Sequence, residues 1–216
     1  MGAMKTAAGF LMAAALFLGP ARAWAGPVWG AEVFGAFTTY GMGEVNDFLA
    51  ATNRAAGTGF DAIHSGYAGG IGARAWLSPR WMLSLTWEPL FAESRIGGGS
   101  AAFNLDAHGV VLGGGWFLPA RDRLRLGLAA GLGYYSIVGE AHDGSGSRNI
   151  GGDGAGGEGL GVGEWSLTPG LALTAGAGYR FVKVGKAQLV GSQVERDADY
   201  SGFIGRFGVA FYRHAR

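Results

Sequence analysis

Two groups of residues in this chain have the types that hydrolytic catalysis uses. His64 stands beside Ser65, and Asp106 lies two residues before His108, with Ser84 on the preceding segment. A serine nucleophile needs a base within hydrogen-bond reach and an acid that orients this base. Whether these residues can act together depends on how the backbone presents them.

The elements that carry these residues are expected to be β-strands, because apolar and polar residues alternate around them with a period of two. Neighbouring side chains on a strand point to opposite faces, so His64 and Ser65 are separated. Asp106 and His108 share a face but lie about 6–7 Å apart, and no serine is evident to complete the set. We therefore predict no catalytic residues.

A glycine-rich segment, His142 to Gly163, holds two patterns associated with ligands. GDGAGG (Gly152 to Gly157) matches a dinucleotide pattern, but no buried strand is expected before it and no helix after it, so we interpret the match as chance. Asp143, Asp153 and Glu158 are the carboxylates that calcium would use, yet a calcium-binding glycine repeat needs tandem copies. The four histidines are scattered. We predict no cofactor and no metal site.

The alternation defines eight strands along the chain. They are expected at Pro27–Gly41, Ala62–Ser78, Trp81–Phe91, Ala101–Leu118, Arg123–Val138, Gly163–Phe181, Val184–Val194 and Ser201–Arg216. Short connections are expected at Ser78–Arg80, Pro119–Asp122 and Val182–Gly185. The longest connections, Met42–Asp61 and His142–Gly163, fall at the other end, and the first is expected to hold a helix over Glu44–Arg54 that caps the structure.

Each expected strand keeps its charges on one face. In the last strand Phe203, Phe207, Val209 and Phe211 share a face, and Arg206 lies on the other. A soluble sheet would bury such phenylalanines, whereas a closed sheet with its apolar face outward satisfies every backbone hydrogen bond inside a bilayer. The pattern predicts an all-β fold, an eight-stranded antiparallel up-and-down transmembrane barrel.

The interior of so small a barrel is filled by side chains. The inward polar residues are expected to be Glu32, Arg74, Glu88, Asp106, His108, Arg125, Arg180 and Arg206. Ions in a dry interior are costly unless they are paired. We predict the pairs Glu32–Arg206, Arg74–Glu88 and Glu88–His108, which together form a polar plug.

Aromatic residues near the strand ends are expected to form two girdles at the membrane interfaces. Trp29, Trp81 and Tyr179 are assigned to the end with short turns. Trp87 and Trp165 are assigned to the opposite end.

The N-terminus has the pattern of a secretory signal peptide. Lys5 precedes an apolar run (Ala7 to Gly19) that is too short to span a bilayer, and AWA (Ala23 to Ala25) resembles a cleavage site. We predict a cleaved signal at residues 1–25 and a barrel domain at residues 26–216. The mature chain would carry 15 basic and 16 acidic residues, a balance that argues against nucleic acid as a partner.

The strand number, alternation and loop lengths resemble the small eight-stranded outer-membrane proteins of Gram-negative bacteria, the OmpA/OmpX/OmpW-like β-barrel group. The resemblance covers the mature chain and implies a location in the outer membrane, in contact with lipid and lipopolysaccharide. It also implies that Phe203, Phe207, Val209 and Phe211 form a C-terminal sorting strand that the barrel assembly machinery recognises.

From these features we expect a non-enzymatic, monomeric barrel with a structural or surface-interaction role. Two alternatives stay open: a lipid-modifying enzyme that uses His64, Asp106 or His108, and a narrow conduit for small hydrophobic molecules.

Overall fold

The computed structural model describes residues 27–95, 102–143, 146–189 and 195–213. The predicted signal peptide, residues 1–25, lies outside these ranges. The strands are β1 (Val28–Thr39), β2 (Ser65–Trp76), β3 (Trp81–Arg95), β4 (Ala102–Arg121), β5 (Leu124–Asp143), β6 (Gly146–Thr168), β7 (Leu171–Leu189), β8 (Glu195–Asp199) and β9 (Gly202–Arg213). One helix, α2 (Gly43–Ala56), follows β1, where the sequence predicts a helix.

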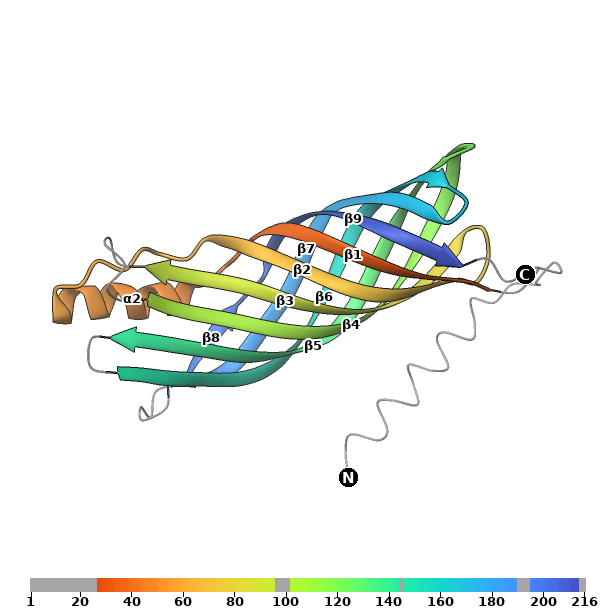
Figure 1. Ribbon diagram of the computed structural model, residues 1–216. Helices are drawn as coiled ribbons and strands as arrows, with labels where there is room; N and C mark the ends of the chain where they lie inside the picture. The colour runs from red at the N-terminus through yellow and green to blue at the C-terminus, as the bar shows by residue number, and fades with distance from the viewer. Residues whose placement is uncertain (1–26, 96–101, 144–145, 190–194, 214–216) are drawn as a thin grey trace, which may run out of the picture.

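The strands form one closed antiparallel barrel (Figure 1). Neighbours in sequence pair from β1 to β7, and β9 closes the barrel by pairing with both β1 and β7. β8 and β9 pair with successive parts of β7, so together they serve as the eighth strand. The predicted eight-stranded up-and-down barrel is confirmed.

The two ends of the barrel differ. One end carries α2, which extends beyond the strands in Figure 1, and we call it the helix end. The opposite end, which we call the turn end, carries the β2–β3, β4–β5 and β6–β7 turns together with the start of β1 and the end of β9. Among the described residues, no helix is long and apolar enough to cross a membrane.

The largest correction concerns the glycine-rich segment. We expected a long loop at His142–Gly163, but β6 occupies most of it, and the β6–β7 turn lies at Pro169–Gly170. The expected turn at Val182–Gly185 is wrong, because these residues lie inside β7.

Close strand contact explains the glycines of this region. A Cβ at Gly178 would lie 2.0 Å from the carbonyl oxygen of Gly159, and one at Gly154 would lie 2.2 Å from that of Lys183. A larger residue at either position would push β6 and β7 apart. The glycines therefore belong to a tightly paired wall of the barrel.

A belt of large apolar side chains surrounds the outside of the barrel. Its members include Val33, Ile71, Leu85, Leu112, Leu128, Leu173 and Phe207, all exposed. Phe207 is the most exposed of them at 74%. Because a soluble protein rarely exposes so large a continuous apolar surface, the belt identifies the part of the barrel that lies against lipid.

Aromatic residues border this belt at both ends, although two assignments change. Trp29 and Trp81 lie at the turn end, as predicted. Trp165 also lies there, because it precedes the Pro169–Gly170 turn, and Tyr179 lies toward the helix end, where it pairs with Phe203. These two errors follow directly from the misplaced turn. The remaining residue of the predicted girdles, Trp87, lies on the outer face, where it is paired with Ile71 and Val110.

The side chains predicted for the sorting strand are placed as expected. Phe203, Phe207 and Phe211 are exposed on the outer face of β9, and Val209 shares their alternation. Recognition of this strand by assembly machinery stays a prediction.

Candidate functional site: a ladder of charges in the lumen

Glu32 on β1 joins two arginines in the lumen. Its carboxylate lies 2.6 Å from Arg74 of β2 and 3.0 Å from Arg206 of β9. The Thr174 hydroxyl donates a further hydrogen bond of 2.7 Å to it. Since Glu32 is only 2% exposed, its charge depends on these contacts rather than on water.

The contacts continue from Arg74 toward the turn end. Arg74 donates to Glu164 at 3.2 Å, and the Tyr212 hydroxyl donates to the same carboxylate. Glu164 also lies 3.6 Å from Arg125. The Arg125 guanidinium stacks on Trp76, 4.4 Å from the ring centre, and its side chain is 37% exposed. This arginine is the water-accessible terminus of the series.

The contacts also continue from Arg206 toward the helix end. Arg206 lies 3.5 Å from Glu158, and Glu158 lies 3.4 Å from Arg180. Arg180, which is fully buried, contacts Glu88 at 2.9 Å. Glu88 then accepts a 2.7 Å hydrogen bond from the hydroxyl of Tyr135.

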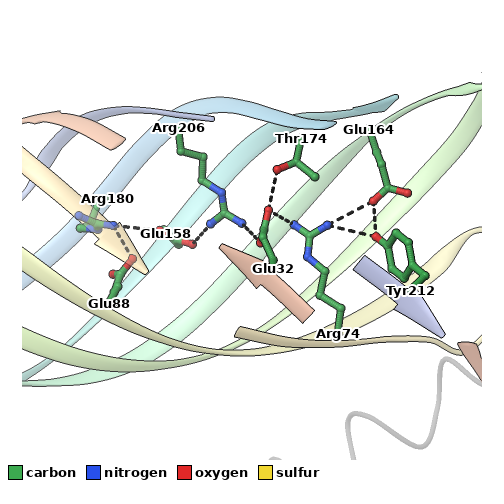
Figure 2. Close-up of polar contacts among 9 residues, drawn as sticks. All are labelled: Glu32, Arg74, Glu88, Glu158, Glu164, Thr174, Arg180, Arg206 and Tyr212. Atoms are coloured by element: carbon green, nitrogen blue, oxygen red, sulfur yellow. Dashed lines mark hydrogen bonds and ion pairs between the residues drawn. The ribbon is translucent and has the colours of Figure 1, made fainter. Parts of the chain in front are cut away.

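Together these contacts form a continuous series, which we call the charge ladder; Figure 2 shows all of its members except Arg125. Its members, in order from the turn end, are Arg125, Glu164, Arg74, Glu32, Arg206, Glu158, Arg180 and Glu88. Positive and negative groups alternate, and the four arginines balance the four glutamates. The charge ladder thus places eight ions in the low-dielectric interior with equal numbers of positive and negative groups.

The sequence identified six of these eight residues and one of their contacts, Glu32–Arg206. The predicted pairs Arg74–Glu88 and Glu88–His108 are wrong, because Arg74 contacts Glu32 and Glu164 while Glu88 contacts Arg180. Arg180 was assigned to the correct face, although its strand was assigned the wrong connections. In the observed strand order the Arg180 side chain lies beside Glu88.

Glu158 was not included in the predicted network because its segment was interpreted as a loop. Glu164 lay in the expected strand Gly163–Phe181 but was not assigned to the inward residues of this strand. A signal was nevertheless present in the sequence. From 157 to 163 the odd positions are all glycine, while the even positions carry Glu158, Leu160 and Val162. This is a period-two pattern with the smallest residue on the outer face.

Asp106 and His108 are not in the lumen, which corrects two predicted site residues. On β4 the buried series is Phe103, Leu105, Ala107 and Val111, so the alternate residues face outward. His108 stacks on the ring of Trp87 with centres 5.8 Å apart. The expected face was wrong because apolar side chains fill the lumen at this level.

This apolar filling forms a plug near the helix end. Phe34, Leu90, Leu105, Leu160, Val182, Tyr200 and Ile204 belong to one buried cluster with Val45 and Leu49 of α2. Nearer the turn end, a cavity of about 30 Å³ lies beside Arg74 and Arg206 and is lined by Ser84 and Thr86. This volume suits one or two water molecules. The plug and the charge ladder therefore close most of the lumen.

α2 is fixed over the plug by two asparagines. The Asn46 side chain donates to the carbonyl of Ile63 at 3.0 Å and accepts from its amide at 2.7 Å. Asn53 makes the same two bonds to Phe60, at 2.9 and 2.8 Å. The segment after the helix is thus held against it. The predicted role of this helix as a cap agrees with this packing.

Replacing Asn46 with alanine is expected to loosen this cap while the barrel stays folded. The change leaves the amide and carbonyl of Ile63 without their partners, at a local cost of about 1–3 kcal/mol. Hydrogen exchange should rise in residues 57–64 and not in β1. The neighbouring exposed Asp47→Ala is the control, and equal exchange in both variants would contradict the proposed clamp.

No protein-family model and no curated protein sequence matches this chain. Solved structures do match it. The structure of Neisserial surface protein A aligns with a TM-score of 0.50 and 15% identity, covering 88% of this chain and 99% of that chain. The outer membrane protein OprG from Pseudomonas aeruginosa aligns with a TM-score of 0.52 and 14% identity, covering 88% and 97%. The fold is that of a small bacterial outer-membrane β-barrel.

In this outer-membrane barrel the three sets of residues have separate places. The apolar belt faces lipid, the charge ladder lies in the lumen, and α2 with its plug closes the helix end. Outer-membrane barrels place short turns on the periplasmic side and longer loops outside the cell, so we expect the turn end to be periplasmic. Asp106 and His108 lie on the outer face rather than in a cavity.

Proposed function

We propose that this protein is a closed, non-enzymatic outer-membrane barrel that anchors an ordered extracellular surface. The observation that carries this proposal is the charge ladder, because each of its eight charged side chains contacts an oppositely charged neighbour. A pore would need charged groups that face water, whereas within the ladder only Arg125, at the turn end, is substantially exposed. Between the ladder and the helix end, the apolar plug supports closure of the barrel on the extracellular side.

The surface role is supported by how α2 is held. In addition to the asparagine clamp, Glu44 accepts a 3.0 Å hydrogen bond from the amide of Asp197. The cap is thus tied to β8 as well as to the segment that follows it. A surface ordered before binding loses less conformational entropy when it contacts a partner.

Conductance of the purified full chain in a planar bilayer tests the closure. We expect no stepwise currents, because neither the ladder nor the plug leaves a continuous water path. A general porin in the same bilayer provides the positive control. Steady, reproducible conductance steps from the folded protein would contradict the proposal.

The absence of enzymatic activity is tested separately. Asp106 and His108 share the outer face of β4, and the His108 ring is stacked on the ring of Trp87. Lipid A from cells that express the protein should therefore match lipid A from cells that do not. A modified lipid A that disappears in His108→Ala would replace this proposal with the enzymatic alternative.

A further inference from the structure

Charged side chains are divided unequally between the two ends of the barrel. At the turn end, the exposed charged residues with described side chains are Arg80, Asp122, Arg123 and Arg213. At the helix end, the exposed charged residues with described side chains are six carboxylates and three cations: Glu44, Asp47, Asp61, Glu93, Asp153 and Asp197, with Arg54, Arg95 and Lys183. Among the exposed side chains that the structure describes, the turn end therefore forms a basic rim, whereas the helix end is acidic.

These arginines lie at the edge of the aromatic girdle. Arg213 is paired with Trp29 across the β1–β9 ladder, so the two side chains share the outer face. Arg80 immediately precedes Trp81, the first residue of β3. Tryptophans of membrane barrels lie at the level of the lipid headgroups. The rim arginines are therefore placed beside the headgroups.

The rim arginines differ from those of the lumen in their partners. Each arginine of the charge ladder contacts a glutamate, whereas the guanidinium groups of Arg80, Arg123 and Arg213 make no ion pair within the described part of the chain. All three are exposed. A guanidinium group binds phosphate with two parallel hydrogen bonds, so it suits the anionic part of a lipid headgroup.

We propose that the basic rim, Arg80, Arg123 and Arg213, binds the phosphates of anionic phospholipids in the leaflet around the turn end. The arginines come from the β2–β3 turn, the β4–β5 turn and the end of β9, so they are distributed around the perimeter. Lipid headgroups surround a barrel in the same way, whereas a soluble polyanion would favour a single concentrated patch. The acyl chains of the same lipids would lie against the adjoining apolar belt.

Lipid selectivity tests this proposal. The full chain is reconstituted in phosphatidylcholine, and the binding of spin-labelled phosphatidylglycerol and spin-labelled phosphatidylcholine at its surface is compared. A basic residue near an anionic lipid surface contributes enough to favour the anionic lipid about fivefold at each site. We expect phosphatidylglycerol to be preferred, with the preference falling as salt is raised.

The variant Arg80→Gln/Arg123→Gln/Arg213→Gln should bind the two lipids equally. Arg54→Gln, at the opposite end, removes the same charge from an exposed site and should keep the preference. Folding is checked by the heat-dependent shift in gel mobility, and Arg213→Gln alone is used if the triple variant does not fold. An unchanged preference in the folded rim variant would overturn the proposal.

In a second experiment, soluble peptidoglycan fragments are added to the reconstituted protein. If the rim binds these fragments and shows no preference between the two lipids, the partner is a cell-wall polymer and the lipid proposal is wrong. If the lipid preference is present and added fragments leave it unchanged, the phosphates come from the membrane.

Discussion

Replacing Glu32 with glutamine is expected to destabilise the barrel by about 3–5 kcal/mol, the range found when one partner of a buried ion pair is removed. Glu32 contacts both Arg74 and Arg206, so its loss leaves two arginines in the lumen with fewer carboxylates. Water compensates for this loss only in part, because the cavity beside Arg74 and Arg206 has a volume of about 30 Å³. The free energy of unfolding is measured by urea titration in lipid vesicles.

Two comparisons isolate this effect. Asp47→Asn removes an exposed carboxylate of α2 and should change the unfolding free energy by less than about 0.5 kcal/mol. Adding Arg206→Gln to Glu32→Gln removes one uncompensated cation, so the double variant should lose less than the sum of the single losses. Equal stability of wild type and Glu32→Gln would show that the ladder does not hold the lumen together.

The second large effect is expected on the outside of the barrel. Phe207 lies midway between Phe203 and Phe211 on β9 and is the most exposed member of the apolar belt. Replacing it with arginine places a charge near the middle of the bilayer, at a cost of about 2–4 kcal/mol. The same urea titration in vesicles measures this change.

The control for Phe207→Arg is Ala51→Arg, on the exposed part of α2. Outside the membrane this substitution should change the unfolding free energy by less than about 0.5 kcal/mol. If Phe207→Arg is as well tolerated as Ala51→Arg, the outer face of β9 meets water. The membrane placement of the belt would then be wrong.

The fold was predictable where large residues alternate on the two faces. β9 is such a strand, since Phe203, Phe207 and Phe211 are outward while Arg206 is inward. The β2–β3 turn was predictable as well, because Ser78, Pro79 and Arg80 interrupt the alternation. Both elements are determined by residues that are neighbours in the sequence, so the sequence alone is enough to predict them.

The prediction from sequence was wrong where a strand does not place apolar residues outside and polar residues inside. From 157 to 163 the outward residues of β6 are glycines, so this part of the strand lacks the apolar face that was sought. In β4 the inward residues are apolar because they join the plug under α2. These features depend on the packing of distant strands, and the periodicity of a single strand does not reveal them.

The ion pairs show the same division between local and distant information. The inward direction of Glu32 and Arg206 follows from alternation, and their contact follows from closure of the barrel between β1 and β9. The partners of Glu88 and Arg180 depend on a register that the misplaced turn concealed. Side-chain direction was therefore easier to predict than side-chain partnership.

The membrane placement of the barrel depends on which face of its wall meets lipid, and spin labels measure this directly. The chain has no cysteine, so single labels are introduced at Leu85 and Leu128 on the outer face and at Thr86 and Ala129 on the inner face. In lipid vesicles, labels at Leu85 and Leu128 should collide frequently with oxygen and rarely with a water-soluble nickel complex. Labels at Thr86 and Ala129 should be shielded from oxygen. Frequent collision of the nickel complex with labels at Leu85 and Leu128 would contradict the account.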